Sequence, residues 1–126
     1  MKNVIAIIAT CIIAATIISA TNKEQKMLRH GVVFKFKDDA RPEDVKKVED
    51  AFRALPSKIK EIKGFEWGTN NSPENLAQGF THCFFLSFKS EADRAVYLPH
   101  PAHKAFGDIL KPYLDKVMVI DYWTKD

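Results

Sequence analysis

The ten residues Leu28 to Lys37 read LRHGVVFKFK, and their pattern decides the fold. Apolar side chains alternate with charged or small ones, which is the period of a β-strand whose two faces meet different surroundings. One face collects His30, Val32, Phe34 and Phe36. The stretch therefore predicts a strand with one strongly apolar face, and a second layer must cover that face.

The residues that follow predict a helix and a second strand. Residues 42–55 carry Val45, Val48, Phe52 and Leu55 at steps of three and four, which is typical of an amphipathic helix. Pro56 ends or kinks this helix. A short strand is expected over residues 65–68. The polar stretch 69–79 is then either a lid over a site or a simple connection.

The second half of the chain is expected to contain a strand, two short helices and a last strand. Residues 80–89 alternate again, with His82, Phe84, Leu86 and Phe88 on one face. Ser90 with Asp93 is typical of a helix N-cap, and one short helix is expected from Ser90 to Leu98. A second helix begins at about His100 or Pro101. The last strand covers residues 115–124, with Val117, Val119 and Asp121 on one face.

The order strand, helix, strand, strand, helix, strand predicts a ferredoxin-like α+β sandwich, a split βαβ fold with a four-stranded antiparallel sheet. One layer of helices covers only one face of such a sheet. The other face still carries apolar side chains, and an apolar face of that size is not expected to stay in water. We therefore expect a homodimer whose two sheets meet face to face and form an α+β barrel. The residues of this second face are Val33, Phe85, Met118, Ile120 and Tyr122.

Composition places the chain among ordinary globular domains. It has 126 residues, 46% of them hydrophobic, and a formal charge of +3. We expect one domain over residues 27–124. The basic residues are scattered, so the sequence gives no sign of nucleic-acid binding. Cys83 lies alone in the expected domain and is predicted to be a buried, inert thiol.

Residues 1–20 are typical of a secretory signal peptide. Lys2 precedes an uncharged, mostly apolar run from Val4 to Ala20, and small residues stand at the expected cleavage site. The alternative is an uncleaved membrane anchor, although 17 helical residues span only about 25 Å of a ~30 Å hydrocarbon core. Lipidation at Cys11 ranks third. In each case the domain is expected to be exported to a periplasmic or extracellular space, with membrane attachment as the open alternative.

The groups best suited to chemistry near neutral pH gather in the stretch YLPHPAHKAFGD, residues 97–108. Tyr97 ends one expected helix, and His103 lies in the first turn of the next. Pro99 and Pro101 separate the two helices. A sharp corner there would aim the Tyr97 and His103 side chains into one space.

Three segments together resemble the stress-responsive dimeric α+β barrel family, known as Dabb. They are residues 28–38, 79–82 and 100–103, and the resemblance extends over about residues 27–124. It implies the dimeric barrel fold. A polyketide cyclase of the family has its catalytic tyrosine and histidine in the matching stretch, and a histidine of its first strand lines the site. The resemblance therefore implies that Tyr97 and His103 are the catalytic pair and that His30 completes the catalytic site.

The same resemblance implies an apolar ligand-binding wall, and the strand and helix periodicities place most of its members on inward faces. Pro99 and Leu114 depart from the family pattern, which affects the aim of Tyr97 and the shape of the pocket. The wall residues are Val32, Phe34, Val48, Phe52, Phe84, Leu86, Leu114, Val117 and Val119.

Three functional hypotheses follow. The favoured one is a pocket that binds a small apolar or aromatic ligand. The alternative is acid–base catalysis of an aldol cyclisation, with His103 as general base, Tyr97 as hydrogen-bond donor to an enolate and His30 orienting the substrate. Against it, a thioester polyketide belongs in the cytosol, whereas this chain is predicted to be exported. In the third, these side chains have structural roles only.

A metal site is a weaker interpretation. His100 and His103 stand three residues apart, and His30 or His82 would have to join them. The sequence has no cysteine pair and no carboxylate motif that would complete a zinc site. We therefore expect neither a metal nor a cofactor. His82 and His100 are expected to be structural, and His100 is a candidate helix cap.

Overall fold

The computed structural model describes residues 15–16 and 25–126. Most of the predicted signal peptide, including Cys11, therefore lies outside the described residues. Across the described part of the chain, no helix has both the length and the apolar character needed to cross a membrane.

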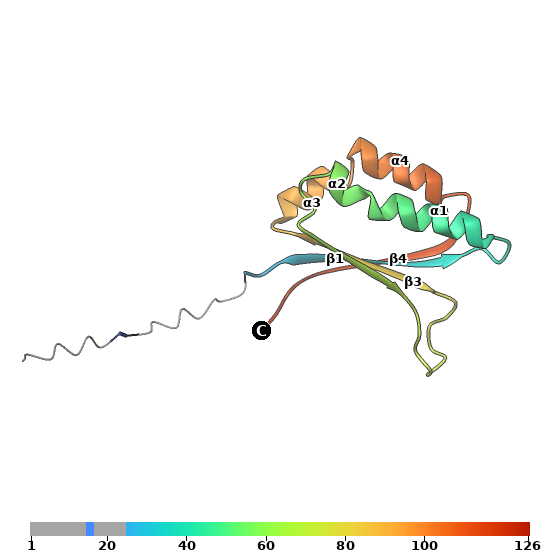
Figure 1. Cartoon of the computed structure of the whole chain (residues 1–126), viewed down its shortest axis with the longest axis horizontal. Helices are drawn as coiled ribbons and strands as arrows, with labels where there is room; N and C mark the ends of the chain where they lie inside the picture. Colours follow the sequence, from blue (N-terminus) through green and yellow to red (C-terminus); the bar gives the residue numbers. More distant parts are fainter. Residues whose placement is uncertain (1–14, 17–24) are drawn as a thin grey trace, which may run out of the picture.

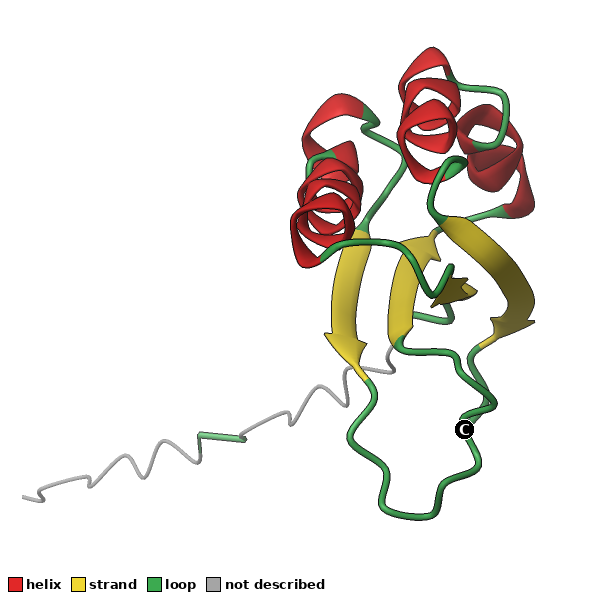
Figure 2. Ribbon diagram, turned by 90° about the vertical axis from the view of Figure 1, so that its right-hand side faces the viewer, coloured by secondary structure: helices red, strands yellow, loops and turns green. Residues whose placement is uncertain are grey.

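The described domain is a four-stranded antiparallel sheet with all its helices on one face (Figure 1). The strands lie in the order β2-β3-β1-β4, so β1 and β3 are central and β4 is an edge strand. Figure 2 shows the helices stacked above the sheet and one long loop extending below it. The predicted ferredoxin-like fold is confirmed. Its elements are β1 (Leu28–Phe36), α1 (Pro42–Arg53), α2 (Leu55–Lys58), β2 (Gly64–Thr69), β3 (His82–Phe88), α3 (Glu91–Tyr97), α4 (Pro101–Leu110) and β4 (Leu114–Trp123).

The helix boundaries follow from local capping. Ser90 precedes α3, and its hydroxyl accepts a hydrogen bond from the Asp93 amide at 3.1 Å, as its predicted N-cap role requires. The predicted helix over residues 42–55 is divided: α1 ends at Arg53, and the short α2 begins before Pro56. Pro56 lies in the first turn of α2. A proline is tolerated there because the backbone N–H that it lacks would have no hydrogen-bond partner within the helix.

The core lies between the sheet and the helices, and aromatic rings fill its centre. Phe52 from α1 stacks on Phe84 from β3, with ring centroids 4.3 Å apart and the planes within 7° of parallel. Phe34 from β1 lies 5.4 Å from Phe84. These contacts hold α1 tightly over the centre of the sheet, so little space remains there.

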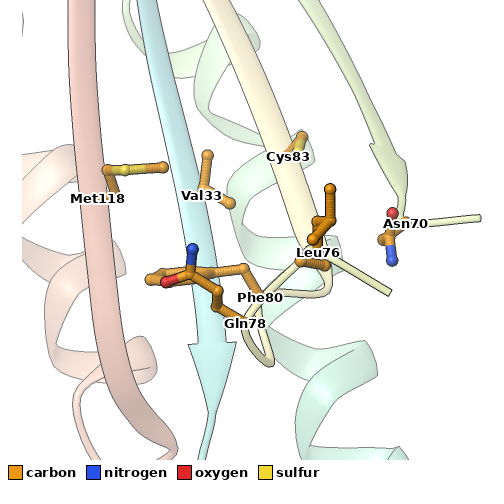
Figure 3. A pocket seen from close by; sticks show the side chains of 8 residues that line it. Val33, Asn70, Leu76, Gln78, Phe80, Cys83 and Met118 are labelled. Atoms are coloured by element: carbon orange, nitrogen blue, oxygen red, sulfur yellow. The ribbon is translucent and has the colours of Figure 1, made fainter. Parts of the chain in front are cut away.

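The opposite face of the sheet has no helices over it. On β4, Met118, Ile120 and Tyr122 are 43%, 57% and 47% exposed. At one end of this face, the loop from Asn70 to Thr81 and the strands enclose a hollow of about 330 Å³ (Figure 3). The loop lines this outer hollow, so it is no lid over the helix side of the sheet. The hollow is lined by Val33, Asn70, Leu76, Ala77, Gln78, Phe80, Cys83 and Met118.

Cys83 is less buried than predicted. Its side chain is only partly buried, because it points to the outer face of β3 rather than into the core. The alternation of residues 80–89 had already placed it opposite His82 and Phe84. Burial there would require a further layer on the outer face.

Candidate functional site

A second cavity, of about 240 Å³, lies on the helix side of the sheet. It is bounded by β1 and β4 below and by α3 and α4 above. Val117 and Val119 form part of its wall and yet are 49% and 52% exposed. The cavity therefore opens to solvent along the β4 edge. Its lining residues are His30, Val32, Phe34, Phe52, Tyr97, Leu98, His103, Phe106, Gly107, Leu110, Val117 and Val119.

His30 is held in place by a hydrogen bond with the Asp121 carboxylate. It lies directly opposite Asp121 in the antiparallel pairing of β1 with β4. Its Nδ1 lies 2.7 Å from Asp121 Oδ1, while Arg94 from α3 donates to the other carboxylate oxygen at 2.7 Å. Because a carboxylate only accepts hydrogen bonds, the His30 proton resides on Nδ1 and the Nε2 atom is left without a role in this pair.

Tyr97 is fully buried at the end of α3, against His30 and His103. Its hydroxyl has no hydrogen-bond partner within the described residues. Burial, with a smaller contribution from the negative charge of Asp121, raises the pKa of the Tyr97 phenol above its usual range. The phenol therefore stays protonated at neutral pH. Its hydroxyl is a buried hydrogen-bond donor without a partner in the described residues, and Tyr97 is one of the residues that line the cavity.

His103 lies in the first turn of α4, and its ring centroid is 4.3 Å from that of Tyr97. The ring Nδ1 lies 2.8 Å from the Leu98 carbonyl oxygen. Since a carbonyl oxygen can only accept, Nδ1 carries the proton and Nε2 of the neutral ring keeps its lone pair. The corner between α3 and α4 thus brings Tyr97 and His103 together, and the His30 ring centroid lies 5.7 Å from that of Tyr97 on the same side of the sheet.

The predicted ligand-binding wall is divided by the structure. Val32, Phe34, Phe52, Val117 and Val119 line the cavity. The remaining four do not: Val48, Phe84 and Leu86 are fully buried in solid core, and Leu114 packs against that core at the start of β4. Four further residues line the cavity that were not among the predicted wall residues: Leu98, Phe106, Gly107 and Leu110.

The other two histidines have structural contacts. His100 is the N-cap of α4, and its Nδ1 accepts from the Ala102 amide at 3.0 Å. His82 lies between two partners, Glu49 Oε1 at 2.8 Å and Thr81 Oγ1 at 2.7 Å. Among the described residues, no group of three or more His, Cys, Asp or Glu side chains is arranged to hold a metal ion.

Comparison with known families identifies the class of protein. The model of the stress responsive A/B barrel domain, Dabb, matches residues 28–124, and the chain belongs to this family. The resemblance of the sequence segments is thereby confirmed.

Two curated relatives and two solved structures illustrate what the chain is similar to. The stress-response A/B barrel domain-containing protein HS1 of Arabidopsis thaliana is 41% identical over 95 residues, which cover 75% of this chain and 87% of the relative. Olivetolic acid cyclase of Cannabis sativa is 30% identical over 95 residues, covering 75% of this chain and 94% of the cyclase.

Among solved structures, a hydroxynitrile lyase from Passiflora edulis superposes with a TM-score of 0.75 at 26% identity, covering 81% of this chain and 96% of the lyase. A dimeric protein of ferredoxin-like fold from Bacteroides fragilis gives a TM-score of 0.63 at 32% identity, covering 76% of this chain and 94% of its own. The chain is thus similar to two proteins that are named as enzymes of different reactions.

Proposed function

We propose that this protein binds a small apolar or aromatic molecule in the cavity between the sheet and the helices. The observation that carries the proposal is Tyr97, which lines the cavity and whose buried hydroxyl has no partner in the described part of the chain. A buried polar group without a partner costs free energy, and a ligand with a hydrogen-bond acceptor removes that cost.

The cavity limits the chemistry of the ligand. Its walls are aliphatic and aromatic apart from Tyr97 and the two histidines. Its volume of about 240 Å³ is below the roughly 300 Å³ at which pockets for drug-sized molecules begin. A compact, uncharged molecule that carries a carbonyl or similar oxygen fits these features best, with the oxygen accepting from Tyr97.

Acetophenone is a suitable probe, since it is a small aromatic ketone. Titration followed by calorimetry would compare the unmodified protein with Tyr97→Phe and with the control Tyr113→Phe, which removes a hydroxyl outside the cavity wall. Loss of one hydrogen bond should weaken binding about threefold to tenfold in Tyr97→Phe alone. No binding by the unmodified protein, or equal binding by all three, would contradict the proposal.

Acid–base catalysis in the same cavity is the second candidate. It is favoured by the His103 tautomer, which leaves a lone pair on Nε2, by the contact of the His103 ring with the Tyr97 ring, and by two similar proteins named as enzymes. In this mechanism His103 Nε2 removes a proton next to a carbonyl group. The electron pair of the broken C–H bond forms the C=C bond of an enolate, and the carbonyl π pair moves to the oxygen. The Tyr97 hydroxyl donates a hydrogen bond to that oxygen, and His30 orients the substrate.

The same probe separates binding from catalysis. Acetophenone has methyl protons next to its carbonyl group, so a positioned base would exchange them for deuterium in D₂O. Proton NMR would follow the loss of the methyl signal. Exchange above the buffer rate that disappears in His103→Gln and in Tyr97→Phe would support the catalyst, whereas binding without exchange would leave the binding function alone.

We also propose that the protein is a homodimer joined through the outer face of the sheet. The support is the exposed apolar surface around Ile120 and the dimeric relative from Bacteroides fragilis. Ile120→Glu should convert the dimer to a monomer in light scattering after gel filtration. Ile109→Glu introduces the same charge on the exposed side of α4 and should remain dimeric. A monomeric unmodified protein would refute this assembly.

Export is a proposal that rests on the sequence of residues 1–20. Mass spectrometry of the protein purified from its own host should find an N-terminus just after Ala20. An intact N-terminus in the membrane fraction would instead support the anchor, and an intact N-terminus in the soluble cytosolic fraction would refute export.

A further inference from the structure

We infer that Gly107 keeps the mouth of the cavity open and thereby sets the largest ligand that the site accepts. This inference rests on the proposed binding function. Gly107 is the seventh of the ten residues of α4 and begins its last turn. Glycine is the least favourable residue in a helix interior after proline, because it loses the most backbone freedom there. Its presence at this position therefore needs a reason.

The backbone does not require glycine here. The positive φ angle of a glycine occurs at Gly79 in the described chain and not at Gly107. A Cβ atom built on Gly107 would meet no atom within 4 Å outside its own helix. At Gly31, by contrast, a Cβ would lie 2.8 Å from the Phe85 ring. Close packing explains the absence of a side chain at Gly31, but it does not at Gly107.

The position of Gly107 at the edge of the cavity explains why it has no side chain. Gly107 lies one turn after His103 on the same face of α4, and both residues line the cavity. Gly107 is itself only partly buried, so it marks the boundary between the cavity and solvent. Val117 and Val119, also half-exposed, line the β4 side. A side chain on Gly107 would therefore enter the opening between α4 and β4.

The opening between α4 and β4 affects the length of the ligand that the site can bind. A molecule that fits within the enclosed volume is indifferent to a side chain at the boundary. A longer, rigid molecule must project past Gly107 over the two valines while its oxygen stays at Tyr97. The site therefore admits, besides compact ligands, aromatic or apolar ligands that are longer than the cavity itself.

Two ketones of different length test this inference. Acetophenone is the short probe and 2-acetonaphthone is the long one, and both carry the same acetyl group. Calorimetric titration would compare the unmodified protein with Gly107→Ala, Gly107→Leu and the control Ala105→Leu, which adds the same side chain on the exposed side of α4. Thermal unfolding would confirm that each variant folds.

Gly107→Leu should weaken 2-acetonaphthone binding about tenfold or more and acetophenone binding much less. Gly107→Ala, which a helix accommodates readily, should show a smaller change in the same direction together with a higher unfolding temperature. Ala105→Leu should change neither affinity. An unchanged ratio of the two affinities in both Gly107 variants would overturn the role of Gly107 alone. Failure of the unmodified protein to bind either ketone would instead refute the proposed function, and this inference with it.

Discussion

Replacing Tyr97 with phenylalanine should make the ligand-free protein more stable. In most proteins the same change removes a buried hydrogen bond and lowers stability. Here the hydroxyl is fully buried and has no partner in the described part of the chain. Phenylalanine removes this unpaired group and keeps the ring contacts with His30 and His103, whose centroids lie 5.7 and 4.3 Å away.

The expected gain follows from the cost of an unpaired buried polar group, which is about 1 to 3 kcal/mol. For a domain of this size, each kcal/mol moves the unfolding midpoint by about 4 °C or more. Tyr97→Phe should therefore raise the midpoint by at least about 4 °C while weakening acetophenone binding. Stability and binding should change in opposite directions, which is typical of a polar group retained for a ligand.

Thermal and urea unfolding at neutral pH would measure the effect, with Tyr113→Phe as the control. An unchanged or lower midpoint in Tyr97→Phe would refute the reasoning. It would mean that the hydroxyl already has a hydrogen-bond partner in the folded protein, such as bound water, and is not free to bind a ligand.

Other perturbations give smaller, separate tests. Because burial raises the pKa of Tyr97, the unfolded chain loses this proton first, near pH 10, and stability should fall as the pH rises from there; urea midpoints across that range should fall less in Tyr97→Phe. Asp121→Asn should lower the unfolding free energy by about 1.5 to 3 kcal/mol, since His30 and Arg94 both lose a charged acceptor; urea unfolding would show it. Ser90→Ala should cost about 1 kcal/mol in the same assay through loss of the α3 N-cap.

The alternation of apolar residues was enough to predict the strands and their faces. His30, Val32 and Phe34 point to the helices, as the pattern of residues 28–37 predicts, and Val33 points the other way. Strand alternation has a period of two residues, so one correct residue fixes the face of all the others. Helix ends were less accurate, because Pro56 is compatible with both the end of one helix and the start of another.

The alternation predicts a face but not the depth of packing over it. Phe84 and Val117 both belong to the inward face, yet only Val117 borders the cavity. Phe84 lies on a central strand and is covered by Phe52, whose ring stacks on it at 4.3 Å. Val117 lies on the edge strand, beyond the close cover of α1. The order of strands in the sheet and the position of the helices decide this difference, and neither can be predicted from the periodicity of apolar residues.

The contacts of Asp121 with His30 and Arg94 were also not predicted, although the sequence contains a signal for them. Asp121 is a charged residue on the otherwise apolar inward face of the last strand, and a charge there needs a partner. Identifying that partner requires the register of β4 against β1, which places Asp121 opposite His30. The second partner, Arg94 on α3, lies 27 residues from Asp121 in the sequence and is brought to it only by the fold.

Methyl-resolved NMR during titration with acetophenone tests the central claim most directly. The valine methyl groups report both faces of the sheet, because Val117 and Val119 border the cavity and Val33 lies on the outer face. Binding in the cavity should shift the Val117 and Val119 signals and leave Val33 unchanged. Shifts confined to Val33, or no shifts at saturating ketone, would contradict a ligand site beneath the helices.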